Sequence, residues 1–304
     1  MKGRPLVSIV IPNFNGRQIL YECLLSLKNL SYSEFEVIVV DNSSADGSAE
    51  MVRNIHPWVR LLETERVGIS EACNRGMRMA KGDIIVTMLN NDMTVDKYWL
   101  DHIVQALRSE EVGVVCGKIY QHGTNLIQAA GGSIDWNTGV AWQVGYGEED
   151  KGQYDSPREV DYVDVPTLRR DVIDEIGGYD EEYYLYYVDV DYCVKAQMAG
   201  YKVLYVPGAV LWHRTSATVG AGTRRQYYYL QRNGWRFLIK YTSGLLLCYR
   251  LYRRMRYVMK RLVLNLFRRK IDLVTLQIAA ILWNLINFRR TARSRNRIFN
   301  DFWY

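Results

Sequence analysis

The strongest constraint on the fold is an alternation in the first third of the chain, where short apolar runs precede longer segments with apolar residues at helical spacing. The apolar runs are 6–11, 35–40, 59–62 and 84–89, and the segments of helical period that follow them are 17–29, 46–54, 69–80 and 96–108. Strands that alternate with helices pair in parallel through right-handed crossovers. The sequence therefore predicts an α/β fold, a Rossmann-like and mostly parallel sheet flanked by helices.

The chain changes character after Val112. Residues 123–162 are rich in glycine, aromatic and acidic residues, which indicates antiparallel strands and loops and a region that meets a second substrate. The ordered elements expected beyond it are helices near 169–176 and 189–199, each closed by glycine, and strands at 201–206 and 209–212 on either side of Pro207-Gly208.

The C-terminal region has a different composition from the rest. From about residue 223 the pattern is helical, and residues 232–304 contain 17 Lys and Arg against two acids. That is a net charge of +15 in a chain of +6, so the remainder carries −9. We predict a catalytic domain at 1–222, with a nucleotide half at about 1–110 and an acceptor half at about 111–222, and a basic helical appendage at 223–304.

Cysteine usage and the N-terminal residues bear on the compartment. The five cysteines form no CxxC pair and no framework spacing, which favours reduced thiols. The first apolar run has six residues, too few for the core of a signal peptide. We therefore expect a cytoplasmic protein.

Short polar residues follow three of the apolar runs. Pro12, Asn13 and Asn15 follow the first run, Asp41 follows the second, and the fourth ends in Asn90-Asn91-Asp92. In open α/β sheets, ligands collect beyond the carboxyl ends of the strands. Asp41 is a natural acceptor for a base N–H or a ribose hydroxyl. Asp92 is a hard oxygen ligand for a divalent cation that neutralises phosphates.

Two common phosphate-binding motifs are absent from the sequence. No GxGxxG follows the first run, and no GxxxxGK[ST] occurs anywhere, so a dinucleotide fingerprint and a P-loop are both excluded. A cation on Asp92 is then the predicted means of holding phosphates. The alternative is that Asn90-Asn91-Asp92 forms an ordinary turn and that Ser44 and Asp46 only cap the following helix.

Several segments together resemble glycosyltransferase family 2, whose members are inverting enzymes of the GT-A fold. The segments that carry the resemblance are VSIVIPNFNG (7–16), EVIVVDNSSADGS (36–48), ERVGISEACNRGMRMAKGDIIVTMLNND (65–92), GGYDEEYYLYYVDVDYCVKAQMAGYKVLYVPGAVLWHRTSA (177–217) and YYYLQRNGWRF (227–237). They occur in the family's order and spacing over about three quarters of the chain. The Asn-rich form of the third segment is similar to a branch that includes rhamnosyltransferases and other polysaccharide-assembly enzymes.

The resemblance implies roles for individual residues. The residue matching Asp41 contacts the nucleotide base, and the aspartate matching Asp92 binds Mg²⁺ or Mn²⁺ through the donor diphosphate. The donor-nucleotide candidates are Pro12, Asn13, Asn15, Asp41, Arg66, Gly68, Asn74 and Asn91. Asn90 and Asn91 stand where many members have acids, and amide oxygens are weaker ligands than carboxylates, which implies a lower metal affinity.

The family's catalytic base lies in a Glu-Asp pair at the start of a helix. Here Val188 replaces the glutamate, Asp189 takes the base position, and Asp191 is a reserve candidate. A carboxylate at a helix N-terminus stays ionised and can accept the proton of an acceptor hydroxyl. The alternative is that both aspartates cap the helix, worth about 0.5–2 kcal/mol.

One histidine and three arginines complete the candidates. His213 matches a histidine that can complete the cation's coordination, and imidazole suits Mn²⁺ better than Mg²⁺. A histidine at a strand end is otherwise a structural residue. Arg66, Arg214 and Arg232 could contact phosphates or be solvated.

The basic tail has the pattern of a membrane-interface segment. Residues 245–267 mix leucine, tyrosine and methionine with arginine, and residues 273–288 have no charge but are too few to span a bilayer. Residues 245–290 are therefore predicted to bind an anionic cytoplasmic membrane surface peripherally. A helix pair packed on the enzyme or in a homo-oligomer is the alternative. Nucleic acid is not expected, because the body is acidic and no recognition motif occurs.

The predicted function is metal-dependent, inverting transfer of a sugar from a UDP-, dTDP- or GDP-linked donor to a hydroxyl group. The acceptor is a glycan or lipid-linked glycan in cell-surface polysaccharide or glycolipid assembly. A nucleotidyltransferase is one alternative, although the basic phosphate loop expected of it after the first strand is absent. A catalytically inactive nucleotide-sugar-binding or scaffold protein is the other, because Val188 and Asn90 replace acids.

Overall fold

The structure is a computed structural model that describes residues 4–214 and 223–302, with side chains described as far as residue 295. Residues 1–3, 215–222 and 303–304 lie outside the described residues, and the predicted domain boundary after residue 222 falls at the edge of the second of these gaps. Contacts divide the chain into two compact units. The first comprises residues 4–133 and 143–214, and the second comprises residues 134–142 and 223–302.

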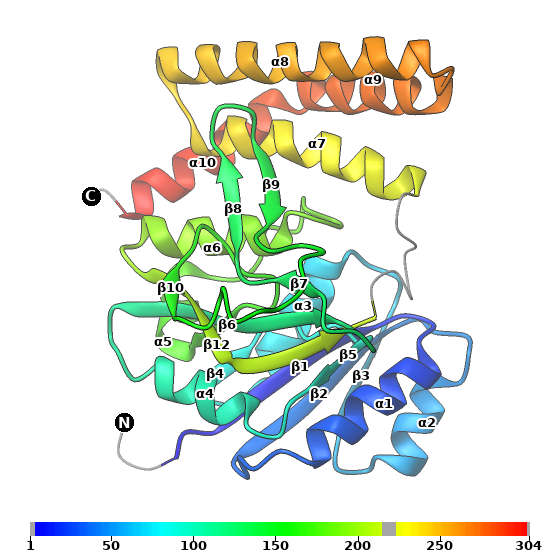
Figure 1. Ribbon diagram of the computed structural model, residues 1–304, viewed down its shortest axis with the longest axis vertical. Helices are drawn as coiled ribbons and strands as arrows, with labels where there is room; N and C mark the ends of the chain where they lie inside the picture. Colours follow the sequence, from blue (N-terminus) through cyan, green and yellow to red (C-terminus); the bar gives the residue numbers. More distant parts are fainter. Residues whose placement is uncertain (1–3, 215–222, 303–304) are drawn as a thin grey trace. The chain divides into compact units, whose positions relative to one another are not determined.

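The first unit is built on a parallel sheet, as predicted. Its first four strands are β1 (Val7–Asn13), β2 (Phe35–Asn42), β3 (Arg60–Thr64) and β4 (Ile84–Val86), in the spatial order β4-β1-β2-β3. The helices that follow the strands are α1 (Arg17–Lys28), α2 (Ser48–Ile55), α3 (Ile69–Met79) and α4 (Trp99–Ala106) (Figure 1). Because the chain runs outward to β3 and returns to β4 beside β1, the strand order reverses between β1 and β4, where α/β sheets bind ligands.

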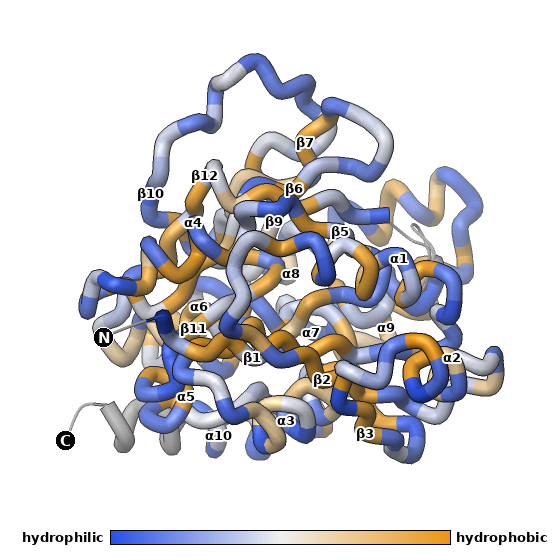
Figure 2. Tube along the Cα trace, turned by 90° about the horizontal axis from the view of Figure 1, so that it is seen from below, coloured by the Kyte–Doolittle hydropathy of each residue, from blue (hydrophilic) through white to orange (hydrophobic). Residues whose placement is uncertain are grey.

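The core of this unit lies in the central strands and in the helices packed against them. Figure 2 shows hydrophobic residues concentrated along β1 and β2, and Ile9, Val10, Ile38 and Val39 are fully buried. Helix α3 packs closely on both strands through Gly76. A Cβ atom at this glycine would lie 2.4 Å from Val10 Cγ1 and 3.0 Å from Val40 Cγ2.

The sheet continues beyond β4 with mixed strand directions. Strand β11 (Thr167–Arg169) runs antiparallel between β4 and β6 (Val112–Gln121), and β12 (Lys202–His213) runs parallel to β6. Three short strands pair antiparallel with these: β5 (Met93–Val95) and β10 (Arg158–Glu159) with β12, and β7 (Ile127–Ala129) with β6. This mixture agrees with the change of pattern predicted after Val112.

Two strand predictions differ from the structure. The strands expected at 201–206 and 209–212 are one strand, β12, because Pro207-Gly208 forms a bulge with a register shift between Val206 and Val210. A bulge accommodates a proline, which has no N–H to donate to the sheet. The run at 84–89 is a strand only as far as Val86, although its backbone bonds continue from the Thr87 N–H to the Pro166 carbonyl (3.0 Å) and from the Leu89 N–H to the Val10 carbonyl (2.9 Å).

Two helices and a hairpin complete the description of the first unit. Helices α5 (Arg170–Ile176) and α6 (Val188–Met198) match the two helical segments expected there. Strands β8 (Gly132–Asp135) and β9 (Val140–Gln143) form a separate hairpin, whose tip belongs to the second unit.

The second unit is helical, as predicted for the tail. It contains α7 (Arg224–Tyr241), α8 (Gly244–Phe267), α9 (Ile271–Ile286) and α10 (Phe288–Phe302), and α8 and α9 lie side by side (Figure 1). The hairpin tip is fixed to these helices: Trp136 contacts the Phe237 ring, and the buried Arg254 donates to the Thr138 carbonyl (2.8 Å). Among the described residues, no single helix is long and apolar enough to cross a membrane. Only α9 with the start of α10, bent by 62°, reaches that length and composition.

Candidate active site

The carboxyl ends of β1, β2 and β4 bring three predicted residues into one hydrogen-bonded chain. Asn13 Nδ2 donates to Asp41 Oδ2 (2.8 Å), and Asn91 Nδ2 donates to Asn13 Oδ1 (2.7 Å). All three side chains are buried. The second carboxylate oxygen of Asp41 accepts from the Ser44 N–H (2.9 Å). Asp41 is therefore held rigidly, and its remaining lone pairs are available to a base or ribose.

The turn after β1 is shaped by a glycine. A Cβ atom on Gly16 would lie 2.2 Å from Asn91 Nδ2, so only glycine lets the turn approach the loop after β4. Asn15 has a positive φ of 47°, and its Oδ1 accepts from the Ala45 N–H (2.8 Å), which ties the turn to the loop after β2. Pro12 precedes this turn within β1. The predicted nucleotide-binding turn is thus fixed at the point where the strand order reverses.

Asp92 and His213 meet although they are far apart in the sequence. His213 ends β12, which pairs with β5 directly after Asp92, and His213 Nε2 lies 3.0 Å from Asp92 Oδ1. The other ring nitrogen, Nδ1, lies 2.7 Å from Gln128 Nε2. Both Asp92 and Gln128 are buried.

The pair offers two ligands to a divalent cation. No group of three or more His, Cys, Asp or Glu side chains is arranged to hold a metal in the described part of the chain. Asp92 and His213 would therefore share a cation with oxygens of the donor diphosphate, an oxygen and nitrogen set that suits Mn²⁺. Gln128 Oε1 is buried without a partner, and a rotated amide would place it on His213 Nδ1–H. That tautomer leaves the Nε2 lone pair free to bind metal, so the residues fit a cation.

Asp189 lies in the first turn of α6, directly after two residues with an unusual backbone conformation. Tyr186 and Tyr187, the residues before this helix, both adopt positive φ angles, of 61° and 63°. This conformation is disfavoured for residues with bulky side chains and occurs most often at functional sites. The conformation of these two residues sets where the first turn of α6 begins and therefore where Asp189 lies.

A second carboxyl group, from the loop before β11, faces Asp189. Asp164 hydrogen-bonds to Asp189, and Gln143 Nε2 lies 3.0 Å from each carboxylate oxygen of Asp164. Burial raises the pKa of the Asp189 carboxyl well above its usual range, and the nearby Asp164 raises it further. Burial also raises the pKa of Asp164, while Gln143 and the charge of His213 oppose that rise. Two carboxyl groups this close do not both ionise readily, so the pair gives up its last proton only at a raised pH.

Three other predicted residues have structural partners. The Asn74 amide bonds the backbone N–H and carbonyl of Tyr179 (2.8 and 3.0 Å), which braces the loop before α6. Gly68 packs against Tyr184 of the same loop. Asp191 is buried in α6. No contact in the described residues tests whether these three also bind substrate, and their assignment stays a prediction.

The arginine candidates lie in different environments. Arg66 is exposed and stacks on the Phe14 ring in the turn after β1, with the guanidinium 4.3 Å from the ring centroid. This position at the edge of the predicted donor site suits a phosphate contact. Arg214 pairs with Glu22. Arg232 belongs to the second unit, where it lies over the Trp283 ring.

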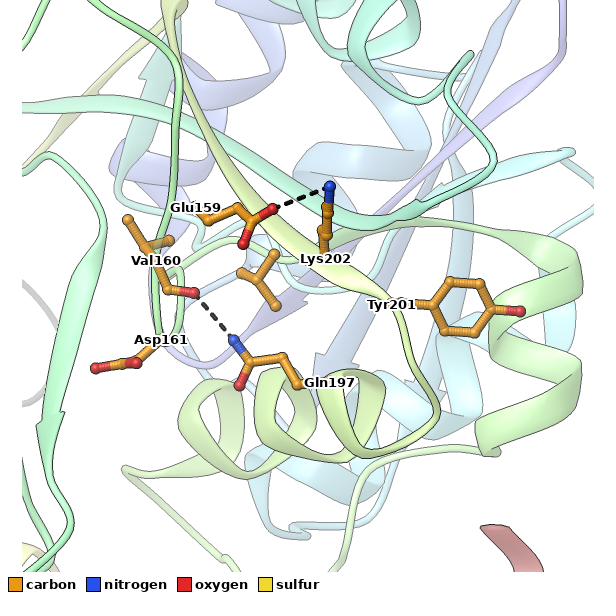
Figure 3. A pocket seen from close by; sticks show the side chains of 7 residues that line it. Glu159, Val160, Asp161, Gln197, Tyr201 and Lys202 are labelled. Carbon is orange, nitrogen blue, oxygen red and sulfur yellow. Dashed lines mark hydrogen bonds and ion pairs between the residues drawn. The ribbon is translucent and has the colours of Figure 1, made fainter. Parts of the chain in front are cut away.

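A separate surface hollow does not belong to this site. It has a volume of about 240 Å³ and lies between β10, α6 and the first residues of β12 (Figure 3). Lys202 Nζ pairs with Glu159 there (3.3 Å), and Gln197 Nε2 donates to the Val160 carbonyl (3.0 Å). His213 lies at the opposite end of β12. The hollow therefore carries none of the predicted chemistry.

Sequence reasoning did not identify three polar residues of the site. They are Asp164, Gln143 and Gln128, which come from short segments without regular spacing. The one signal was the acid at position 164 in the otherwise apolar stretch 162–166, where a charge is costly unless it has partners.

Several known proteins are similar to this chain in sequence. Residues 8–177 match the sequence model of "Glycosyl transferase family 2". The uncharacterized protein y4gI of Sinorhizobium fredii is 30% identical in an alignment 258 positions long that covers 76% of this chain and 28% of that protein. The O-antigen biosynthesis protein RfbC of Myxococcus xanthus is 29% identical in an alignment 235 positions long that covers 72% of this chain and 18% of that protein. The chain spans less than a third of either relative.

Solved structures share the fold. S. aureus TarS 1–349 in complex with UDP-GlcNAc aligns with a TM-score of 0.59 and 16% identity, over 96% of this chain and 92% of that one. The mannosyltransferase PcManGT from Pyrobaculum calidifontis, in complex with GDP-Man and Mn²⁺, aligns with a TM-score of 0.56 and 18% identity, over 99% and 86%. The parallel sheet with its mixed extension is thus the GT-A fold. Because the family match covers more than half of the sequence, the chain belongs to glycosyltransferase family 2.

Proposed function

We propose that the chain transfers a sugar from a nucleotide-diphosphate donor to a hydroxyl group of a glycan or lipid-linked glycan, with inversion at the anomeric carbon. The observation that carries the proposal is the hydrogen-bonded chain of Asp41, Asn13 and Asn91 beside the Asp92–His213 pair, where the strand order reverses. A nucleotide-diphosphate donor needs hydrogen-bonding groups for its base next to cation ligands for its diphosphate. Similar structures hold GDP-Man or UDP-GlcNAc, which favours a sugar nucleotide as the donor.

The protein groups divide the chemistry among them. Asp41 accepts from the base or ribose, and Arg66 contacts the phosphates from the edge of the site. Asp189 accepts the proton of the acceptor hydroxyl, whose oxygen forms the new bond at the anomeric carbon as the bond to the diphosphate breaks. Asp92 and His213 would hold a Mg²⁺ or Mn²⁺ ion, which would neutralise charge on the leaving diphosphate. Family membership favours this transfer over nucleotidyl transfer or a scaffold role.

A screen of donors tests the proposal. We would follow thermal unfolding with UDP-, dTDP- and GDP-sugars, each with Mn²⁺, with Mg²⁺ and with a chelator. A donor present at about 100 times its Kd stabilises the native state by about 2.7 kcal/mol. We expect one base class to raise the unfolding temperature, and the rise to depend on the cation. No shift with any sugar nucleotide would contradict the proposal.

The second unit is proposed to attach the protein to an anionic membrane surface on the cytoplasmic side. Helices α8 and α9 expose large apolar side chains, with Leu245, Phe267 and Ile286 exposed by 89%, 84% and 82%. Exposed basic residues lie beside them, including Arg268-Arg269-Lys270 between the two helices. Apolar side chains flanked by cations match the chemistry of anionic lipid headgroups over acyl chains. This location favours a lipid-linked acceptor and a role in cell-surface polysaccharide or glycolipid assembly.

Vesicle sedimentation tests the attachment. We expect binding to phosphatidylserine vesicles and little binding to phosphatidylcholine vesicles. Reversal of Arg268, Arg269 and Lys270 to glutamate removes about 1 kcal/mol per cation, so affinity falls by about two orders of magnitude. Equal reversal at Arg53, Arg75 and Arg78 of the first unit is the control. Unchanged sedimentation of the tail variant would refute the membrane proposal. In that case, a dimeric mass disrupted by the same changes would assign the surface to a homo-oligomer.

A further inference from the structure

The carboxyl group of Asp164 is placed against the predicted base by elements separate from it. Asp164 lies in the loop before β11, Asp189 lies on α6, and Gln143 ends β9. The Gln143 amide nitrogen lies 3.0 Å from both oxygens of Asp164, which fixes this carboxyl group beside Asp189. The residue directly before Asp189 is Val188, which is buried and carries no charge. Asp164 is thus the acid that the fold supplies to Asp189.

The contact between the two acids has a chemical consequence. Two carboxyl groups hydrogen-bond to each other only when one of them holds a proton. The transfer step starts from the pair with both acids ionised, so when Asp189 accepts a proton from an acceptor hydroxyl, it becomes the protonated partner of an Asp164 carboxylate. The arrangement therefore stabilises Asp189 in the form that it takes after proton transfer, and an adjacent anion also makes Asp189 a stronger base.

We propose that Asp164 is a positioning residue that orients the carboxyl group of Asp189 and stabilises the proton that Asp189 accepts during transfer, with Gln143 fixing Asp164. This inference rests on the proposed function. In the balanced step, the acceptor O–H bond breaks and its proton moves to Asp189, where it is hydrogen-bonded to Asp164. The acceptor oxygen bonds to the anomeric carbon, and the nucleoside diphosphate leaves with the electron pair of the broken bond.

Other titratable groups surround the pair. Asp164 and Asp189 interact electrostatically with Cys116 on β6, Tyr162 in the loop before β11 and Cys193 on α6. His213 at the end of β12 acts on Asp164. Burial raises the pKa of Cys116, Tyr162 and Cys193 above their usual values, so these three groups stay neutral over the pH range of the test.

The first experiment uses Asp164→Asn, which keeps the size and a hydrogen bond but removes the charge. Initial rates with the donor found in the screen would be measured against pH. We expect donor affinity to stay within about twofold and kcat to fall about tenfold, part of the range that general base catalysis supplies. The acid limb of the kcat profile moves to lower pH, because Asp189 loses the neighbouring anion. Asp164→Glu restores part of the rate, and Asp164→Ala does not.

A matched control is Asp161→Asn, three residues earlier, where the aspartate accepts from Ser133 (3.0 Å) instead of facing Asp189. It should keep both the rate and the pH profile of the wild type. If Asp164→Asn leaves the acid limb in place, or lowers kcat and donor affinity equally with no rescue by Asp164→Glu, the positioning role is wrong and Asp164 is only structural.

The second experiment needs no transfer activity. Thermal unfolding of the full chain, without metal or donor, is compared between about pH 4 and about pH 8. In the wild type, two neighbouring acids must ionise as the pH rises, and this lowers the stability of the native state. Asp164→Asn should therefore lose less stability over this interval than either the wild type or Asp161→Asn. Parallel pH dependence of all three would overturn the inference. If Asp164→Asn shows this smaller pH dependence but no donor supports transfer, the proposed function is wrong while the interaction between Asp164 and Asp189 is still supported.

Discussion

Replacing Asn13 with alanine tests the chain of buried amides that fixes the predicted nucleotide site. The change removes all three hydrogen bonds of the Asn13 side chain, to Asp41 (2.8 Å), to Ser44 Oγ (3.3 Å) and from Asn91 (2.7 Å). Asp41 is 2% exposed and Asn91 is 5% exposed, so neither group recovers its lost partner from bulk water. A buried polar group left without a partner costs about 1–3 kcal/mol. Because Asp41 keeps its bond from the Ser44 N–H, we expect a total loss of about 3 kcal/mol.

Thermal unfolding measures this loss. In a unit of this size each kcal/mol lowers the unfolding temperature by about 2–4 °C, so Asn13→Ala should lower it by about 6–12 °C. Asn54→Ala, on the exposed face of α2, is the control and should change stability by less than about 0.5 kcal/mol. In a double-mutant cycle, Asn13→Ala and Asn91→Ala should couple by more than about 0.5 kcal/mol. Additive effects, or a loss of less than about 1 kcal/mol for Asn13→Ala, would refute the reasoning.

Three further changes test other parts of the structure. Asp189→Asn should raise the unfolding temperature near pH 8 more than near about pH 4. Because the pKa of the wild-type acid is raised, the native state binds more protons than the unfolded state. The wild type therefore loses stability as the pH rises above about 3.9, the usual pKa of aspartate. An equal change at both pH values would contradict this assignment. Asp92→Ala should abolish the cation dependence of donor binding in isothermal titration, whereas Asp96→Ala, four residues on, should preserve it. Gly76→Ala should lower stability by about 1–3 kcal/mol in denaturant unfolding despite its better helix propensity, because its Cβ would overlap Val10; a gain in stability would show that α3 can move away from the sheet.

The sequence was sufficient for the first four strands and their helices because the apolar runs of β1, β2 and β4 are buried on both faces and each helix keeps a regular period. The same logic placed Asn13, Asp41 and Asn91 at one edge of the sheet, since carboxyl ends of parallel strands must meet there. It could not predict that the three side chains bond to each other. That depends on Gly16, whose missing Cβ lets the turn after β1 approach Asn91.

The parts that could not be predicted are those that depend on non-local pairing. The contact between Asp92 and His213 needs the antiparallel pairing of β5 with β12, which joins residues more than a hundred positions apart. Asp164 meets Asp189 only because the loop before β11 passes the first turn of α6. Pro207-Gly208 was interpreted as a break between strands, because the signal for a bulge and the signal for a turn are the same residues.

Release of nucleoside diphosphate tests the central claim most directly. The donor found in the screen would be incubated with cation and a hydroxyl acceptor, and donor affinity and diphosphate release would be measured for the wild type and for Asp189→Asn. The proposed role of Asp189 predicts that the variant binds donor with unchanged affinity and releases diphosphate at least about 100-fold more slowly. Release by Asp189→Asn at the wild-type rate would contradict it.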